Sequence, residues 1–266
     1  MLSVDRTLAC ASCHRPGHAF SDSVAHSRGV RAQETARNAP TILNRAYGQS
    51  LFWDGRAGSL EEAVVQPIQN RSEMDLPLLV LVGRLREDNA YRRAFAQEFP
   101  DTVTEQNIAR ALASYVRTLR SGNAPIDQFL GGERNALSPE AETGMRLFMG
   151  KANCVTCHVG PNFTDEKFHN TGVSGGAGDP GRQAVTGREE DRGSFKVPSL
   201  RNVALTAPYM HDGSFATLEA VIDFYDCGGS PNLRLDPEIR PLGLRLDQKK
   251  ALVAFLNALT GELPRR

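Results

Sequence analysis

The chain has 266 residues, enough for one large domain or two smaller ones. Its 31 basic and 31 acidic residues cancel, so the net charge gives no electrostatic basis for binding nucleic acid or an anionic membrane. A hydrophobic content of 40% excludes wholesale disorder, and no apolar run approaches the roughly 18 residues that span a bilayer. We therefore expect a soluble, folded protein with no nucleic-acid partner and no membrane span.

In chain order, the first motif is the pentapeptide CASCH at residues 10–14, and the same pattern returns as CVTCH at residues 154–158. The pattern C-x-x-C-H is the attachment signature of c-type haem. The two thiols form thioethers with the haem vinyl groups, and the adjoining imidazole reaches the iron. The predicted haem-binding residues are therefore Cys10, Cys13, His14, Cys154, Cys157 and His158, with both histidines as iron ligands.

A C-x-x-C pair has two other interpretations, a redox disulfide and half of a zinc site. A thioredoxin-like disulfide lies in a βαβ pattern, which neither motif has. A four-cysteine zinc site would have to join motifs that stand 144 residues apart, and it would leave both following histidines without a role. The fifth cysteine, Cys227, belongs to neither pattern and is interpreted as a bystander thiol.

Helical spacing of apolar residues predicts a mainly α fold with few strands and with long loops, notably over residues 163–208. Helices are expected at residues 60–69, 78–89, 89–99, 105–119, 139–149, 217–225 and 247–259. An amphipathic helix ends roughly a hundred residues after each motif, so the chain is an internal repeat. The repeat predicts two cytochrome c-like helical domains, residues 1–122 and 133–266, each holding one c-type haem and joined by a turn-rich linker near residues 121–132.

The helix at residues 139–149 leads into the second motif, with Ser138 as its N-cap and Pro139 at its first position. Only nine residues precede Cys10, and they contain neither a matching helix nor a signal peptide. We therefore expect the natural reading frame to extend upstream and to supply both.

Five further stretches accompany the motifs: RNAPT at 37–41, LFWDGRA at 51–57, QPIQNRSEM at 66–74, FHN at 168–170 and FKVPSLRNVALTAPYMHDG at 195–213. With this set, the chain resembles the bacterial di-haem cytochrome c peroxidase family, which includes MauG, over essentially its whole length from Leu2. The resemblance implies that the N-terminal haem reacts with peroxide and that the C-terminal haem supplies the electrons.

The same resemblance assigns the peroxide pocket. The family's catalytic glutamate corresponds to Glu73, a carboxylate that can take a proton from one peroxide oxygen and return it to the other. The distal-pocket proline corresponds to Pro67, whereas a glutamine that lines this pocket in better-known peroxidases is replaced by Ala63. Trp53, the only tryptophan, is implied to relay electrons between the haems, and its size also suits a packed core anchor.

The resemblance also implies a Ca²⁺ site between the haems. Its ligands correspond to the side chain of Asn38 and the carbonyl oxygens of Thr206 and Pro208. Hard oxygen ligands of this kind suit Ca²⁺, although no sequence pattern alone would identify the site.

The sixth iron ligands separate two branches of the family. Where the C-terminal haem usually has methionine, this chain has Tyr225, as MauG does, with Met210 as the alternative ligand. A phenolate favours ferric iron and lowers the potential, whereas methionine raises it. The removable distal histidine of the N-terminal haem corresponds to Val30, and His18 and His26 are out of register, so we expect that haem to be five-coordinate at rest.

These residues leave three functions open. The first is reduction of hydrogen peroxide to water with electrons from a small cytochrome c or cupredoxin. The second is a MauG-like oxidation of residues in a partner protein, which Tyr225 and the missing distal histidine favour. The third is a passive di-haem electron carrier, against which Glu73 argues. Because haem is attached to C-x-x-C-H outside the bacterial cytoplasm, the protein is expected to be periplasmic.

Overall fold

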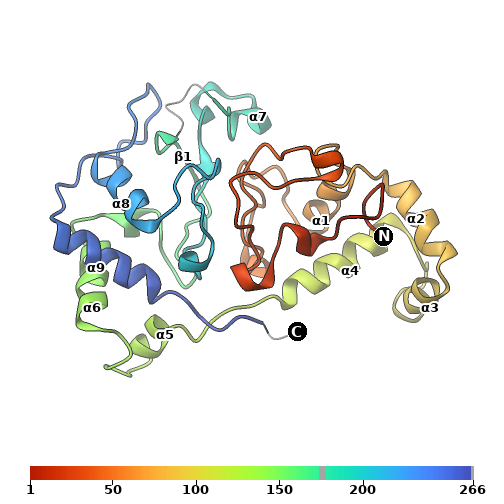
Figure 1. The fold of residues 1–266 in the computed structure, drawn as a ribbon, viewed down its shortest axis with the longest axis horizontal. Helices are drawn as coiled ribbons and strands as arrows, with labels where there is room; N and C mark the ends of the chain where they lie inside the picture. The colour runs from red at the N-terminus through yellow and green to blue at the C-terminus, as the bar shows by residue number, and fades with distance from the viewer. Residues whose placement is uncertain (174–177, 265–266) are drawn as a thin grey trace.

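The computed structural model describes residues 1–173 and 178–264, and within them the fold is mostly helical, as predicted. The helices are α1 (Leu60–Gln69), α2 (Leu78–Glu87), α3 (Asn89–Glu98), α4 (Glu105–Thr118), α5 (Pro125–Leu130), α6 (Pro139–Met149), α7 (Gln183–Thr186), α8 (Leu218–Asp226) and α9 (Leu246–Asn257). Figure 1 shows α1 to α4 on one side of the molecule and α6, α8 and α9 on the other. In the described ranges, no helix combines the length and the apolar character needed to cross a bilayer.

All seven expected helices are present, and their ends differ from the prediction by at most two residues. Helix α2 stops before Asp88 because this side chain accepts hydrogen bonds from the backbone N–H groups of Ala90 and Tyr91, at 2.9 and 3.3 Å, and so caps α3. Thr217, predicted as a helical residue, is instead the N-cap of α8. Its hydroxyl accepts the Ala220 N–H at 3.2 Å.

The linker prediction was wrong in one respect, because residues 121–132 contain the helix α5. Pro125 begins this helix, and the Asp127 carboxylate accepts the Ala124 N–H at 2.9 Å. Arg201 then donates to both oxygens of Asp127, each at 2.7 Å. A segment rich in turn residues becomes helical here because its first turn is capped and held by a distant arginine.

Helices α6 and α9 pack closely against each other and form the centre of the largest buried cluster. A Cβ at Gly144 would lie 1.9 Å from the Ala251 carbonyl oxygen, so only glycine allows this approach. The rings of Phe148 and Phe255 meet edge to face, with centroids 5.1 Å apart. Cys154 packs on the same cluster, so the helix pair supports the second pentapeptide.

Smaller buried clusters pack the helices of the first half. One of them joins α2 and α4 through Leu81 and Ile108 and is extended by the N-terminal segment. The guanidinium of Arg84 on α2 donates to the carbonyl oxygens of Met1, Ser3 and Val4 at 2.6–3.1 Å. The segment that leads into the first pentapeptide is therefore fixed to a helix.

The long loop predicted over residues 163–208 contains two short strands and α7. Strands β1 (Phe168–His169) and β2 (Phe195–Lys196) pair antiparallel, with Phe168 opposite Lys196. At the other end of the molecule, Glu262 pairs with Gly122, so the C-terminal segment returns to the connection between α4 and α5 (Figure 1).

Candidate functional site

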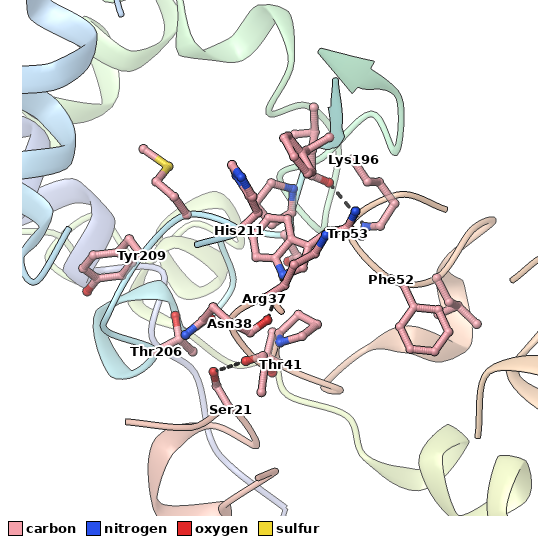
Figure 2. Close-up of a pocket in the computed structure, with 18 of the residues that line it drawn as sticks. Ser21, Arg37, Asn38, Thr41, Phe52, Trp53, Lys196, Thr206, Tyr209 and His211 are labelled. Carbon is pink, nitrogen blue, oxygen red and sulfur yellow. Dashed lines mark hydrogen bonds between the residues drawn. The ribbon is translucent and has the colours of Figure 1, made fainter. Parts of the chain in front are cut away.

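A single cavity of about 1290 Å³ receives residues from both halves of the chain. It exceeds the roughly 300–1,000 Å³ of ordinary small-ligand pockets. Its wall includes every residue that the sequence analysis assigned to a site, namely Cys10, Cys13, His14, Asn38, Trp53, Pro67, Glu73, Cys154, Cys157, His158, Thr206, Pro208, Met210 and Tyr225. Figure 2 shows part of this wall.

The two pentapeptides have the same backbone. Each begins with a short 3₁₀ helix, at Cys10–Ser12 and at Cys154–Thr156. In each motif the histidine N–H donates to the carbonyl oxygen of the first cysteine at 2.9 Å. The cysteines of the described residues are all free thiols, and these residues form no cluster of three or more His, Cys, Asp or Glu side chains that could hold a metal ion. Both thiols of each pair are therefore available for thioether bonds.

Both motif histidines are oriented by a backbone carbonyl. Nδ1 of His14 lies 3.1 Å from the carbonyl oxygen of Phe20, and Nδ1 of His158 lies 2.9 Å from that of Phe163. The two phenylalanines have positive φ angles of 58° and 51°. An Nδ1–H that donates to a carbonyl leaves the Nε2 lone pair for a metal, and burial lowers the pKa of both imidazoles, which favours the neutral form.

Glu73 lies in a tight turn that follows α1. Asn70 Nδ2 donates to Glu73 Oε1 at 2.6 Å, while Asn70 Oδ1 accepts both the N–H and the hydroxyl of Ser72 at 3.0 Å. Burial raises the pKa of Glu73, opposed by this hydrogen bond and by the charge of Arg56. Burial raises the pKa of the Cys13 thiol in the first pentapeptide, and the charge of Glu73, which lines the same cavity, adds to this rise. One oxygen of Glu73 is thus held by Asn70, and the other is left for chemistry.

A neighbouring loop closes on the Glu73 turn. The Val30 N–H donates to the Glu73 carbonyl oxygen at 2.8 Å, and a Cβ at Gly29 would lie 2.0 Å from the Ser72 carbonyl oxygen. Glycine is required here because any side chain would collide with the backbone of the turn. Val30 is buried outside the described cavity wall.

The other residues considered for the peroxide pocket form two groups, those that line the cavity and those outside its described wall. Pro67 and Ala63 line the cavity from α1, together with Glu73. His18 and His26 are not part of its described wall, and Nδ1 of His26 instead lies 2.9 Å from the Thr35 carbonyl oxygen.

Trp53 connects the two halves through its backbone and its ring. Its indole N–H donates to the Asn38 carbonyl oxygen at 2.9 Å, and its own carbonyl accepts the Lys196 N–H at 2.7 Å (Figure 2). Its ring meets His211 edge-on at 6.5 Å between centroids, and His211 stacks on Phe195 at 3.6 Å. Trp53 is only half-buried and is not among the residues of the buried core, so it lies on a cavity wall rather than within a packed cluster.

Both candidate sixth ligands line the cavity. The phenol of Tyr225, in the last turn of α8, lies close enough to the thiols of Cys154 and Cys157 for their charges to act on it. Burial raises the pKa of Tyr225 to about 12, opposed by a hydrogen bond with Thr171. Met210 has a φ of 74° and lies in a turn that precedes α8. Tyr225 is therefore near the second pentapeptide, as Glu73 is near the first.

The implied calcium ligands share the cavity wall. Asn38 is only 4% exposed, and its Nδ2 donates to the Val24 carbonyl oxygen at 3.0 Å, so its Oδ1 is the atom available to a cation. Thr206 and Pro208 line the same cavity. All three donors are neutral oxygens, whereas Ca²⁺ takes about six to eight oxygen ligands.

Comparison with known proteins decides the family. A sequence profile described as di-haem cytochrome c peroxidase matches residues 1–135. The methylamine utilization protein MauG of Methylorubrum extorquens is 38% identical over 270 residues, which cover 98% of this chain and 75% of that protein. The chain belongs to the di-haem cytochrome c peroxidase family.

Two further members extend the comparison. The cytochrome c551 peroxidase of Nitrosomonas europaea is 36% identical over 268 residues, covering 99% of this chain and 77% of that protein. The solved structure of a MauG-like protein associated with microbial copper homeostasis matches with a TM-score of 0.91 and 34% identity, covering 98% of this chain and 86% of that one. As a member of a family of peroxidases and MauG proteins, the chain is an oxidoreductase.

The residues present fit the haem groups that this family implies. Each half supplies two free thiols and one carbonyl-oriented imidazole in the same arrangement, and both sets face one cavity. Apolar side chains such as Ala63, Leu112 and Leu252 form much of the remaining wall, as a macrocycle requires.

The cavity also contains ion pairs that the sequence analysis did not identify. Arg37 Nη1 donates to Asp54 at 2.6 Å and its Nη2 to Asp179 at 2.7 Å. Arg45 pairs with Glu166, 121 residues further along the chain. Arg37 lies in one of the stretches that carry the family resemblance. Its partners Asp54 and Asp179 follow 17 and 142 residues later, and no sequence pattern indicates either pairing.

Proposed function

We propose that this protein is a di-haem c-type peroxidase that reduces hydrogen peroxide to water with electrons from a small redox protein. The observation that carries the proposal is the arrangement of the cavity. One wall combines both pentapeptides with a carboxylate of raised pKa near the first of them. A passive electron carrier has no use for such a carboxylate.

Each half then acts as a cytochrome c-like domain, residues 1–122 and 133–266. Cys10, Cys13 and His14 hold the N-terminal haem, and the corresponding residues of the second pentapeptide hold the C-terminal haem. The haems supply the iron at which peroxide is reduced and a store for the electrons.

Glu73 moves the proton during this reaction. With the haem in place, Glu73 Oε2 would take a proton from one peroxide oxygen and return it to the other, which would leave as water while the haem supplied the electrons that break the O–O bond. Asn70 orients the carboxylate by holding Oε1. Pro67 lines the same wall and excludes water from it. Ala63 adds no hydrogen-bonding group, so Glu73 carries the proton transfer.

Electrons enter from a small cytochrome c or cupredoxin at the C-terminal haem and pass by way of Trp53. The support for this role is that Trp53 hydrogen-bonds to Asn38 in the first half and to Lys196 in the second. The ring is fixed by its own hydrogen bond to Asn38 and the backbone by Lys196, so Trp53 offers an electron route without moving during the reaction.

A MauG-like activity, the oxidation of residues in a partner protein, is the second candidate. The proximity of Tyr225 to Cys154 and Cys157 favours it, because a phenolate ligand stabilises ferric iron at the C-terminal haem. Met210 is the ligand expected of an ordinary peroxidase.

A calcium ion and a periplasmic location complete the proposal. Asn38, Thr206 and Pro208 hold Ca²⁺ between the two halves. Metal analysis of the purified protein is expected to find one calcium per chain and to lose it in Asn38→Leu. Export follows from the chemistry of haem attachment, and cell fractionation of the natural host tests it.

Steady-state peroxide turnover with a reduced cytochrome donor tests the main proposal. Rapid turnover supports a peroxidase. Oxidised haem that accumulates without turnover supports the MauG-like alternative, and no reaction with peroxide supports a passive carrier.

A further inference from the structure

Three charged residues in and beside the cavity wall have no role in the proposed function. Arg45 donates to both carboxylate oxygens of Glu166 at 2.9 Å, and Lys196 lies beside this pair. The three side chains are 11%, 13% and 9% exposed, so all are nearly buried. Arg45 comes from the first half, whereas Glu166 and Lys196 come from the second. The cluster therefore connects the halves next to Trp53.

The ammonium group of Lys196 lacks a close acceptor among the described residues. Among these residues, its nearest acceptors are Glu166 Oε2 and the Val197 carbonyl oxygen, each at 3.5 Å. Charge-assisted N–H···O bonds are about 2.7–2.9 Å long, and an ammonium has three N–H groups to donate. Glu166 meets this ammonium only at 3.5 Å and shares its charge with Arg45, which donates to both carboxylate oxygens at 2.9 Å.

Asp165 is the other acid whose charge acts on Lys196. Its carboxylate lies 3.5 Å from His169 Nε2 and 3.9 Å from Lys167 Nζ, so it is shared with two other cations. Desolvation lowers the pKa of Lys196 to about 8. A buried ammonium is stable only when a counter-charge meets it, so the cavity wall calls for one more anion at this point.

Backbone hydrogen bonds connect the segments around Lys196 to the second pentapeptide. The Asp165 N–H donates to the Cys157 carbonyl oxygen at 2.8 Å, and the Val197 N–H donates to the Lys167 carbonyl oxygen at 2.8 Å. Lys196 itself lines the cavity and donates its backbone N–H to Trp53 (Figure 2). An anion that meets Lys196 would therefore lie at the cavity wall, in the half of the chain that carries the second pentapeptide.

We propose that Lys196 binds a propionate carboxylate of the C-terminal haem, while Arg45 holds Glu166 beside it. This inference rests on the proposed attachment of haem to the second pentapeptide. Reduction adds a negative charge to the iron, so a fixed cation at the haem edge favours the reduced form. Lys196 is thus a positioning residue that raises the potential at which the C-terminal haem accepts electrons from the donor.

The test compares two lysines that are close in the fold. Lys196→Met removes the buried charge with little change in volume, and Lys167→Met removes the same charge from a side chain that is 76% exposed. In fully loaded protein, Lys196→Met is expected to lower the reduction equilibrium constant of the C-terminal haem about tenfold, a shift of about 59 mV for one electron. It is also expected to shift the propionate-bending band in the resonance Raman spectrum. Lys167→Met changes neither, because solvent screens its charge.

Haem content is measured for every variant, since it separates this inference from the proposed function. Wild-type protein that carries no haem at the second pentapeptide would overturn the proposed function. Lys196→Met with both haems, an unchanged potential and an unchanged Raman band overturns the propionate assignment alone. Lys196→Arg and Lys196→Gln are compared in the same way if the methionine variant fails to fold. The arginine variant is expected to keep the wild-type potential and the glutamine variant to lose it, and equal potentials would reject the assignment.

Discussion

Residues 10–20 and residues 154–163 have the same local structure, but the side chains that lie near them in the cavity differ. In both, a 3₁₀ helix presents two thiols, and a phenylalanine carbonyl orients the histidine. Near the first motif lies the carboxylate of Glu73, whereas near the second lies the phenol of Tyr225. The repeat thus supplies the same candidate haem-binding residues twice, whereas the side chains that distinguish their surroundings come from segments outside it.

The two motifs have different neighbours because Glu73 and Tyr225 come from elements that do not correspond to each other in the repeat. Glu73 comes from a turn after α1 that Asn70 and Gly29 shape, and Tyr225 comes from the last turn of α8. A carboxylate can exchange a proton with a bound peroxide, and a phenol can ligate iron directly. We therefore expect substitutions of Glu73 to affect the reaction with peroxide, and substitutions of Tyr225 to affect the spectrum and the potential of the C-terminal haem.

The largest effect is expected from Glu73→Gln. The amide keeps the size of the side chain but cannot accept a proton, so the reaction with peroxide should slow by about 10²–10⁴-fold. Stopped-flow mixing of the loaded protein with excess peroxide measures this rate. Glu98→Gln, an exposed change on α3, is the control and should react like wild type. A Glu73→Gln protein that reacts at the wild-type rate would remove Glu73 from the mechanism.

Tyr225→Phe should alter the second haem and leave the first unchanged. If Tyr225 is the ligand, the variant loses one oxygen ligand and almost no packed volume, so the stability cost should be about 1 kcal/mol, close to that of the hydrogen bond with Thr171. The low-spin ferric signal of the C-terminal haem should be lost or replaced, and its potential should rise. Met210→Leu is the matched comparison. A Tyr225→Phe spectrum identical to wild type, with loss of a near-infrared sulfur-to-iron band in Met210→Leu, would assign the ligand to Met210.

A smaller effect is expected from Asn70→Ala, seen as a shift in pH dependence. Glu73 accepts a proton only when ionised, so the rate rises as pH increases through its pKa, which burial places above the ordinary value. The hydrogen bond from Asn70 opposes that rise, and its removal should move the acid limb of kcat/KM to higher pH. The shift should be about one to two pH units, because such a bond to a charged group is worth roughly 1.5–3 kcal/mol.

Gln69→Ala, an exposed change one residue away, provides the baseline for that pH profile. If both alanine variants show the wild-type acid limb, Asn70 does not tune Glu73. A limb that moves to lower pH would show that the bond stabilises the protonated carboxyl instead.

The sequence predicted the parts of this molecule that are local or repeated, and it missed those that depend on distant pairs. The helices were predictable because their apolar spacing and N-caps lie within each segment, as at Ser138 and α6. The helix α5 was missed because its stability depends on Arg201, 74 residues away from Asp127. The pairing of Arg45 with Glu166 was missed for the same reason. Glu73 and Tyr225 could be named from the family resemblance, but no sequence pattern indicated their proximity to the thiols.

Low-temperature EPR of the oxidised protein with both haems in place reports the spin state of each ferric haem in one spectrum. By the family resemblance, Val30 corresponds to the distal histidine, and His18 and His26 are outside the described cavity wall, so the N-terminal haem should give a high-spin ferric signal. The C-terminal haem should give a low-spin signal that only Tyr225→Phe changes. Two low-spin signals, neither altered by Tyr225→Phe, would contradict the account and indicate a passive electron carrier with both irons six-coordinate.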